Sequence, residues 1–327
     1  MKRVQYEQMG KPAQVLKVID VPAQPLRAGE VRVKVLATPI HPSNLLQIAG
    51  EYGVGPTLPA IPGSEGIGCV TETAADVVTL KVGQRVMLVA GSTWQEEIVA
   101  PAAAFVGLPE VGDIEQMSML AVNPLTAHLL LESFVELKPG DWVVQSAANS
   151  AVGEYLIQLA KLRGYKSVNV VRRDSLVPEL QAQGADVVLV DGPDLSERIR
   201  AAIQGAQLSL AIDAVGGETF SRLAGALAYG GTLVSYGSLS RQPLVMNPTS
   251  VIFNGVRVLG FWLQKWFQGA SSADKQVALG TLIPLVASGQ LKVKIDSRFA
   301  IADIASAVTR ASEPGRSGKV LLTAAAQ

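Results

Sequence analysis

The stretch between Ser146 and Gly153, SAANSAVG, combines small side chains with hydroxyl and amide groups. An apolar run at residues 142–144 precedes it, and from Val152 onward apolar residues recur on one face of a helix. This order of strand, turn and helix brings the first backbone N–H groups of the helix to the end of the turn, where they attract anions. We therefore interpret the segment as a turn that binds phosphate groups.

The turn lacks most of the glycines of the fingerprint common in dinucleotide-binding folds. Only Gly153 is present, at the position that lets the helix approach the strand closely. Small residues replace the others, and several could hydrogen-bond phosphate oxygens directly. The alternative is an ordinary crossover that binds nothing. The residues that we expect to bind the cofactor here are Asn149, Ser150, Ala151, Val152 and Gly153.

Two arginines follow the second strand of the same unit, which we place at residues 168–171. Sites for NAD usually have an acidic residue about 20 residues past the glycine motif, where it binds the ribose 2′-hydroxyl. Arg172 and Arg173 instead suit charge-assisted, bidentate bonds to a 2′-phosphate. We therefore expect NADPH as the cofactor. Asp174 follows directly and leaves NAD open, and a further alternative is that both arginines are merely solvated.

Length and composition limit the class of protein. The chain has 327 residues, enough for two domains of ordinary size. Its formal net charge of +0 offers no basic surface for nucleic acid or an anionic membrane. The single cysteine, Cys69, excludes an intramolecular disulfide. We find no run of about 18 apolar residues to span a bilayer and no signal-peptide core in the first residues, and we expect a cytoplasmic protein.

The pattern along the chain predicts two domains. Residues 1–122 contain short alternating or apolar runs separated by glycine and proline, typical of a β domain. From residue 123 to residue 266 helices alternate with strands, which predicts a doubly wound parallel sheet of α/β type. We expect residues 267–327 to complete the first domain. The further strands of the parallel sheet are expected at residues 186–190, 208–213, 232–236 and 256–261.

Five segments together resemble the motifs of zinc-independent medium-chain dehydrogenases/reductases. They are GEVRVKVLATPIHPSN, PAIPGSEGIGCV, LKVGQRV, LKPGDWVVQ and SGKVLL. The resemblance implies a chaperonin-like β domain paired with a doubly wound Rossmann domain, with the active site in the cleft between them. In the zinc enzymes of this superfamily, a cysteine and a histidine bind metal near the positions of Pro42 or Ser43 and of Ser64. These residues are not ligands of the usual kind, so the resemblance implies no metal.

Two groups within the zinc-free branch compete, the 2-enoyl thioester reductases and the quinone oxidoreductases. Four segments resemble the mitochondrial-type enoyl reductases: AVNPLTAHLLL, QSAANSAVG, VNVVRRD and GFWLQKW. The expected function is NADPH-dependent reduction of an activated carbon–carbon double bond in an enoyl thioester or enone. The alternatives are a quinone oxidoreductase and a non-enzymatic NADPH-binding module.

Reduction of an activated double bond needs a hydride, donors that stabilise the developing enolate, and a proton for the α carbon. Tyr52 is a candidate donor, since a phenol can protonate a far more basic carbanion. Its alternative is a loop tyrosine that packs on the domain rim. Asn123 and Thr126 could orient the nicotinamide or the substrate. For Asn123 a structural alternative is a helix N-cap, followed by Pro124 in the first turn.

We assign five further residues to the expected cofactor site. Phe261 and Trp262 follow the last strand of the parallel sheet, and could wall a hydrophobic acyl slot or cap the core. Asn44 and Tyr236 are assigned with them. Lys319 resembles a family lysine near the cofactor, although a lysine near a chain end is usually solvated.

Three polar residues and one strand receive structural expectations. We expect His41 to be a turn residue, His128 to pack in a helix, and Glu65 to bond backbone groups within the β domain. The strand at residues 256–261 would be an exposed sheet edge unless it paired with a second copy of the chain. We therefore expect a homodimer.

Overall fold

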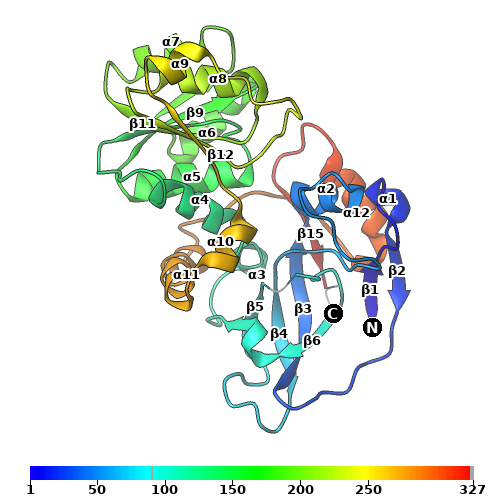
Figure 1. The fold of residues 1–327 in the computed structure, drawn as a ribbon. Helices are drawn as coiled ribbons and strands as arrows, with labels where there is room; N and C mark the ends of the chain where they lie inside the picture. The colour runs from blue at the N-terminus through cyan, green and yellow to red at the C-terminus, as the bar shows by residue number, and fades with distance from the viewer. Residues whose placement is uncertain (90, 325–327) are drawn as a thin grey trace. The chain divides into compact units, whose positions relative to one another are not determined.

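The computed structural model describes residues 1–89 and 91–324, and these form two compact units (Figure 1). Unit 1 contains residues 1–122 and the chain from Leu279 onward, and unit 2 contains Asn123–Ala278. The return to the first unit was expected at residue 267, and it falls at residue 279 instead. Helix α11 (Ser272–Ala287) runs across this point without interruption, so no turn signal marks it in the sequence.

Unit 1 is built on a sheet in the order β14-β15-β3-β4-β5-β7, with β6 paired to β3. The pairs are antiparallel except β14 with β15. The strands are β3 (Glu30–Pro39), β4 (Gly66–Thr73), β5 (Arg85–Leu88), β6 (Glu97–Pro101), β7 (Phe105–Gly107), β14 (Ile295–Phe299) and β15 (Lys319–Thr323). A separate pair contains β1 (Lys2–Gln5) and β2 (Lys17–Asp20), and the helices are α1 (Pro12–Val15), α2 (Pro42–Ala49), α3 (Ile114–Met117) and α12 (Ile304–Ser312).

The alternation expected along residues 31–36 determines which face of β3 is buried. Val31, Val33 and Val35 are buried in one cluster with residues of β4 and β5, while the residues between them are partly exposed. This period of two places one apolar face of the strand in the core. The β-domain prediction is therefore confirmed in its main element.

Unit 2 contains a parallel sheet in the order β10-β9-β8-β11-β12-β13. The strands are β8 (Trp142–Gln145), β9 (Lys166–Val171), β10 (Val187–Val190), β11 (Leu208–Asp213), β12 (Thr232–Ser235) and β13 (Arg257–Gly260). The helices are α4 (Asn123–Glu132), α5 (Ala151–Leu162), α6 (Val177–Gln183), α7 (Leu195–Ala202), α8 (Gly217–Ala226), α9 (Pro248–Ile252), α10 (Leu263–Gly269) and most of α11.

The strand order of unit 2 reverses between β8 and β11. The chain moves outward from β8 through β9 to β10, and then returns to β11 and moves the other way. Right-handed crossovers therefore place helices on both faces of the sheet, and the carboxyl ends of β8 and β11 flank a switch point where ligands bind in such folds. The expected doubly wound sheet is confirmed.

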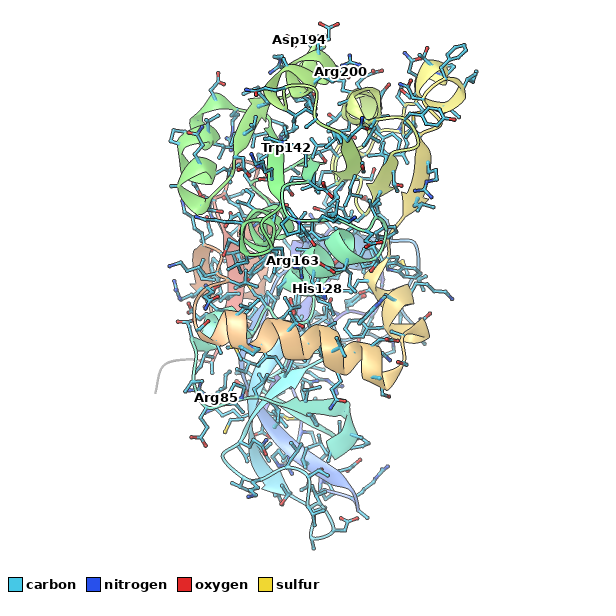
Figure 2. All side chains as sticks on the ribbon, turned by 90° about the vertical axis from the view of Figure 1, so that its left-hand side faces the viewer. Arg85, His128, Trp142, Arg163, Asp194 and Arg200 are labelled. Atoms are coloured by element: carbon cyan, nitrogen blue, oxygen red, sulfur yellow. The ribbon has the colours of Figure 1, made fainter. Side chains whose placement is uncertain are left out.

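His128 and Arg163 lie close together in unit 2 and are joined by a hydrogen bond (Figure 2). The guanidinium can only donate, so His128 Nδ1 accepts, and Arg163 Nη1 also lies 2.9 Å from Glu132 Oε1. Burial, with a smaller contribution from the charge of Arg163, lowers the pKa of His128 to about 4. His128 is thus a neutral residue that joins α4 to α5, in keeping with the packing role expected for it.

No helix among the described residues combines the length and apolar character needed to cross a membrane.

Candidate functional site

The turn after β8 has a backbone that only a glycine at position 153 permits. A Cβ atom on Gly153 would lie 2.5 Å from the Ala148 oxygen and 2.7 Å from its Cα, closer than real Cβ atoms come. The helix therefore approaches the turn as closely as the sequence predicted. Ser150 caps α5, because its Oγ accepts a hydrogen bond of 3.2 Å from Gly153 N.

The start of α5 is suited to an anion. The first amides of a helix have no acceptor within the helix, and the dipole of this 12-residue helix adds partial positive charge. Asn149 is exposed at the tip of the turn, and Ser150, Ala151 and Val152 are partly exposed. Four of the five predicted turn residues are therefore accessible, while Gly153 is buried against Ala148.

Arg172 and Arg173 directly follow β9, and both side chains are exposed. Arg173 has extended backbone angles and precedes a short 3₁₀ turn that begins at Asp174. Neither guanidinium makes a hydrogen bond or ion pair with the described residues. Both therefore retain the donors that a 2′-phosphate would need.

A buried carboxylate that the sequence interpretation missed joins the turns after β8 and β11. Asp213 accepts a 2.6 Å hydrogen bond from Ser146 Oγ, and also bonds from the N–H groups of Val215 and Gly216 at 3.1 and 2.8 Å. Burial raises the pKa of Asp213, and these hydrogen bonds oppose the rise. The available signal was its place at the end of a predicted strand, where polar residues flank the switch point.

Tyr236, expected at the cofactor site, directly follows β12 and is brought close to Ser150. Burial raises its pKa, the Ser150 hydroxyl opposes the rise, and the charge of Asp213 adds to it. The backbone N–H of Tyr236 donates to the main-chain carbonyl oxygen of Asp213 at 2.9 Å. The structure therefore places Tyr236 near the turn after β8, and its role toward a cofactor stays a prediction.

Unit 1 contains a second polar cluster, in its interior. Glu65 Oε1 lies 2.7 Å from His41 Nε2, and His41 Nδ1 lies 3.0 Å from Lys319 Nζ. These three side chains are 0%, 3% and 4% exposed. Glu65 Oε2 also accepts from the backbone N–H groups of Ala121 and Val122, as expected for a residue that bonds backbone within the β domain.

Two residues assigned to the cofactor have hydrogen-bond partners within unit 1. Asn44 caps α2, accepting from His41 N at 2.9 Å and donating to Ser64 Oγ at 2.5 Å. Lys319 is buried rather than solvated, and it also donates to the Ile40 oxygen at 3.2 Å.

The other candidate residues are divided between the units. Tyr52 is partly exposed in unit 1, three residues after the end of α2. In unit 2, α4 begins at Asn123 itself, so Asn123 lies inside the helix rather than at the expected N-cap. Its Nδ2 is buried without a hydrogen-bond partner, and Thr126 is buried one turn further on.

The aromatic residues after β13 serve more than one purpose. The ring of Phe261 packs edge-on against Phe134, with centroids 6.1 Å apart at 87°, as a core-capping residue would. Trp262 is 37% exposed and therefore keeps surface for a ligand.

The described residues hold no group of three or more histidine, cysteine, aspartate or glutamate side chains that could bind a metal ion. At the positions of the zinc ligands of related enzymes, Ser64 accepts a hydrogen bond from Asn44 and Pro42 starts α2. Cys69 is a free thiol and only partly buried.

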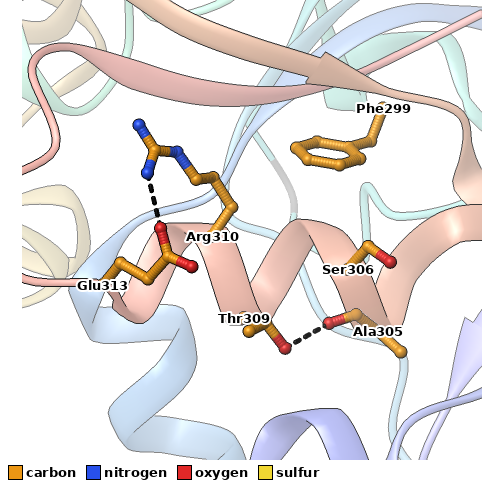
Figure 3. Close-up of a pocket in the computed structure, with 6 residues that line it drawn as sticks. All are labelled: Phe299, Ala305, Ser306, Thr309, Arg310 and Glu313. Atoms are coloured by element: carbon orange, nitrogen blue, oxygen red, sulfur yellow. Dashed lines mark hydrogen bonds and ion pairs between the residues drawn. The ribbon is translucent and has the colours of Figure 1, made fainter.

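A hollow of about 390 Å³ on unit 1 contains none of the candidate residues (Figure 3). It lies over α12 and the end of β14, and its Arg310 is held by Asp296 and Glu313. The lining residues are Phe299, Ala305, Ser306, Thr309, Arg310 and Glu313. Because its cation is already paired and its surface is open, we do not include it in the site.

Comparison with known proteins identifies the class. Residues 27–116 match the family of alcohol dehydrogenase GroES-like domains, and residues 151–277 match the zinc-binding dehydrogenase family. The mitochondrial enoyl-[acyl-carrier-protein] reductase of Homo sapiens is 35% identical over 97% of this chain and 87% of its own length. The corresponding Arabidopsis thaliana enzyme is 33% identical over 90% of this chain and 80% of its own length.

Solved structures extend the likeness to the fold. A Bacillus thuringiensis protein assigned as an NADPH:quinone reductase superposes with a TM-score of 0.91, at 32% identity over 99% of this chain and 98% of that one. The complex of Etr1p with NADP and crotonyl-CoA has a TM-score of 0.89, at 28% identity over 99% of both chains.

The two-unit fold and these matches define a medium-chain dehydrogenase/reductase. More narrowly, the chain belongs to that family's enoyl reductase type. The family description mentions zinc, but the described residues provide no group of ligands for it.

The close approach at Gly153 yields a prediction. In Gly153→Ala the new methyl group would meet the Ala148 backbone, and overpacking of this kind typically costs about 1–3 kcal/mol. We expect a lower Tm and at least a tenfold loss of affinity for NADPH, measured by calorimetric titration. Gly280→Ala is the matched control, because that exposed helical glycine has nothing within 4 Å of the added Cβ. Unchanged NADPH affinity in Gly153→Ala would contradict the placement of the cofactor at this turn.

Proposed function

We propose that this chain is an NADPH-dependent reductase of the activated carbon–carbon double bond of 2-enoyl thioesters. The observation that carries the proposal is the pairing of an open helix start at α5 with two exposed arginines after β9, in a chain of the enoyl reductase type. The Homo sapiens relative is named for enoyl-[acyl-carrier-protein] reduction, and Etr1p binds NADP and crotonyl-CoA.

The residues present fit NADPH. Gly153 allows α5 to pack closely on Ala148, the start of α5 offers unpaired N–H groups for a pyrophosphate, and Arg172 and Arg173 offer donors for a 2′-phosphate. Tyr236 lies beside Ser150, where its hydroxyl could donate to the pyrophosphate of the cofactor. When bound, NADPH supplies the hydride that the reduction needs.

The chain must itself supply hydrogen-bond donors for the enolate and a proton for the α carbon. We assign the proton to Tyr52, a partly exposed phenol in unit 1. Asn123 has an amide nitrogen without a partner in the described structure, which makes it a donor available for the substrate or the nicotinamide. Thr126 follows on the same helix.

A quinone reductase is the second candidate, favoured by the likeness to the Bacillus thuringiensis protein. Turnover of NADPH with crotonyl-CoA and, separately, with 1,4-naphthoquinone distinguishes the two reactions. Tight NADPH binding without either turnover would instead support a non-enzymatic binding module. The cytoplasmic location stays a prediction, because the curated relatives named above are mitochondrial.

We also propose that the chain forms a homodimer through β13. This strand is at the edge of the sheet of unit 2, and Val258 and Leu259 are each 44% exposed. The neighbouring helix α9 and the residue after it add exposed apolar side chains, Val251, Ile252 and Phe253. An apolar sheet edge of this kind is stabilised by pairing with its symmetry mate. A Candida tropicalis 2-enoyl thioester reductase forms an Etr1p/Etr2p heterodimer.

The first prediction of the proposed function concerns cofactor choice. Each charged hydrogen bond from Arg172 or Arg173 to a 2′-phosphate contributes about 1.5–3 kcal/mol. The double variant Arg172→Ala, Arg173→Ala should therefore bind NADPH at least tenfold more weakly, with NADH affinity nearly unchanged, in fluorescence titrations. Arg27→Ala, which removes an exposed arginine of unit 1, is the control. The assignment fails if the double variant binds NADPH as tightly as the parent chain.

The second prediction concerns the group that donates the proton to the α carbon. Tyr52→Phe keeps the ring and deletes only the hydroxyl, so loss of a positioned proton donor should lower kcat on crotonyl-CoA by about 10²–10⁴. NADPH affinity should be unchanged, and Tyr229→Phe, at an 84% exposed tyrosine, should behave as the parent chain. Near-normal kcat in Tyr52→Phe would mean that solvent or another group delivers the proton and that Tyr52 lines the pocket.

The third concerns assembly. Leu259→Asp places a charge on the exposed edge of β13 and should convert the dimer to a monomer, as measured by light scattering at micromolar concentration. Val78→Asp, at an 87% exposed residue of unit 1, should stay dimeric. A parent chain that scatters as a monomer of 34.4 kDa would refute the dimer.

A further inference from the structure

Three titratable side chains that the proposed function does not use form one hydrogen-bonded row inside unit 1. The row runs from Glu65 through His41 to Lys319, with steps of 2.7 and 3.0 Å. It joins positions that are far apart in the sequence, near the start of β4, before α2 and at the start of β15. All three side chains are at least nine-tenths buried.

The chemistry of the three side chains determines which atom donates in each of the two hydrogen bonds of the row. An ammonium has only donors, so Lys319 donates to His41 Nδ1. The other ring nitrogen of a neutral imidazole then carries the hydrogen, so His41 Nε2 donates to Glu65. Burial, aided by the charges of Lys319 and Arg316, lowers the pKa of His41 and keeps the ring neutral. Burial raises the pKa of Glu65 to about 8 and lowers the pKa of Lys319 to about 7, and the attraction between the two charges opposes both shifts. In the charged form of this pair, the row links a carboxylate to an ammonium through a neutral histidine.

The second carboxylate oxygen of Glu65 binds backbone N–H groups. Its Oε2 accepts from Ala121 N at 2.7 Å and from Val122 N at 2.9 Å. Val122 is the last residue of unit 1, and the next residue begins α4 with the candidate donor Asn123. Hydroxyl groups of Thr38 and Thr93 bond the Glu65 main-chain oxygen at 2.6 and 2.9 Å, and fix the position of the residue itself.

We propose that Glu65, His41 and Lys319 are positioning residues for the reaction, because their row holds the backbone of Ala121 and Val122 that leads into α4. The inference rests on the proposed function, in which Asn123 and Thr126 serve the substrate or the nicotinamide. A carboxylate makes stronger hydrogen bonds to N–H groups than a neutral amide does. Its buried charge needs a counter-charge, which Lys319 supplies through His41.

The test compares catalysis with stability and cofactor binding. In the double variant Glu65→Gln, Lys319→Met no charge is left unpaired in the row, but an amide replaces the carboxylate that holds the two N–H groups. Since small misplacements of reacting groups can cost about 10²-fold in rate, we expect kcat on crotonyl-CoA to fall by roughly 10–100-fold. NADPH affinity, which depends on unit 2, should change less than about twofold.

Asp296→Asn is the matched control. It removes a carboxylate of unit 1 that pairs with Arg310 at 2.7 Å and has no hydrogen bond to residues 121–122 in the described structure. It should lower Tm without changing kcat. A double variant with the kcat of the parent chain would overturn the proposal, and so would a loss of kcat matched by an equal loss of NADPH affinity.

Amide hydrogen exchange provides a measurement independent of turnover. The N–H groups of Ala121 and Val122 should exchange at least tenfold faster in the double variant, and in Lys319→Met alone, than in the parent chain. Unchanged exchange at these two amides would overturn the proposal even if the parent chain showed no enoyl reduction. If the parent chain showed no turnover but the variants exchanged faster, the proposed function would be refuted. The conclusion that the row fixes the backbone of Ala121 and Val122 would still be supported.

Discussion

The cofactor turn depends on the close approach of α5 to the backbone of Ala148. Only a glycine at position 153 permits that approach, because a Cβ atom there would lie 2.5 Å from the Ala148 oxygen. With the helix held so close, Ser150 caps it and the unpaired N–H groups of its first turn lie at the end of β8. The other glycines of the usual fingerprint are dispensable, since small polar residues meet the remaining steric requirement.

A second constraint is electrostatic, because the turn that we propose to bind anions lies next to a buried carboxylate. Asp213 would be costly to bury without hydrogen bonds, and it accepts them from Ser146, Val215 and Gly216. These donors belong to the turns that follow β8 and β11, so the charge stabilises the loops around the switch point. Under the proposed function, the phosphates of the cofactor are then bound by other groups, the start of α5 and the exposed arginines after β9.

How much of this the sequence could reveal depended on how local each feature is. The phosphate turn and the arginines lie within one strand–helix–strand unit, so periodicity and residue type predicted them, and the parallel sheet followed from the same pattern. Asp213 pairs with Ser146 across 67 positions, and His41 pairs with Lys319 across 278. No local pattern records such pairs, and for this reason the sequence did not show that Lys319 is buried against His41. The end of the second domain was missed for a related reason, since α11 passes through it without a break.

The row of Glu65, His41 and Lys319 in unit 1 is suited to fixing the backbone of Ala121 and Val122. A lone carboxylate at Glu65 would be strongly disfavoured in so buried a position, and burial does raise its pKa. A lysine in direct contact would compete with the backbone N–H groups for the same oxygens. With His41 between them, Lys319 balances the charge from a distance, and Oε2 stays available to Ala121 and Val122. The neutral imidazole thus lets Lys319 balance the charge of Glu65 without occupying the oxygen that holds the backbone, so loss of either the ammonium or the carboxylate should weaken that hold.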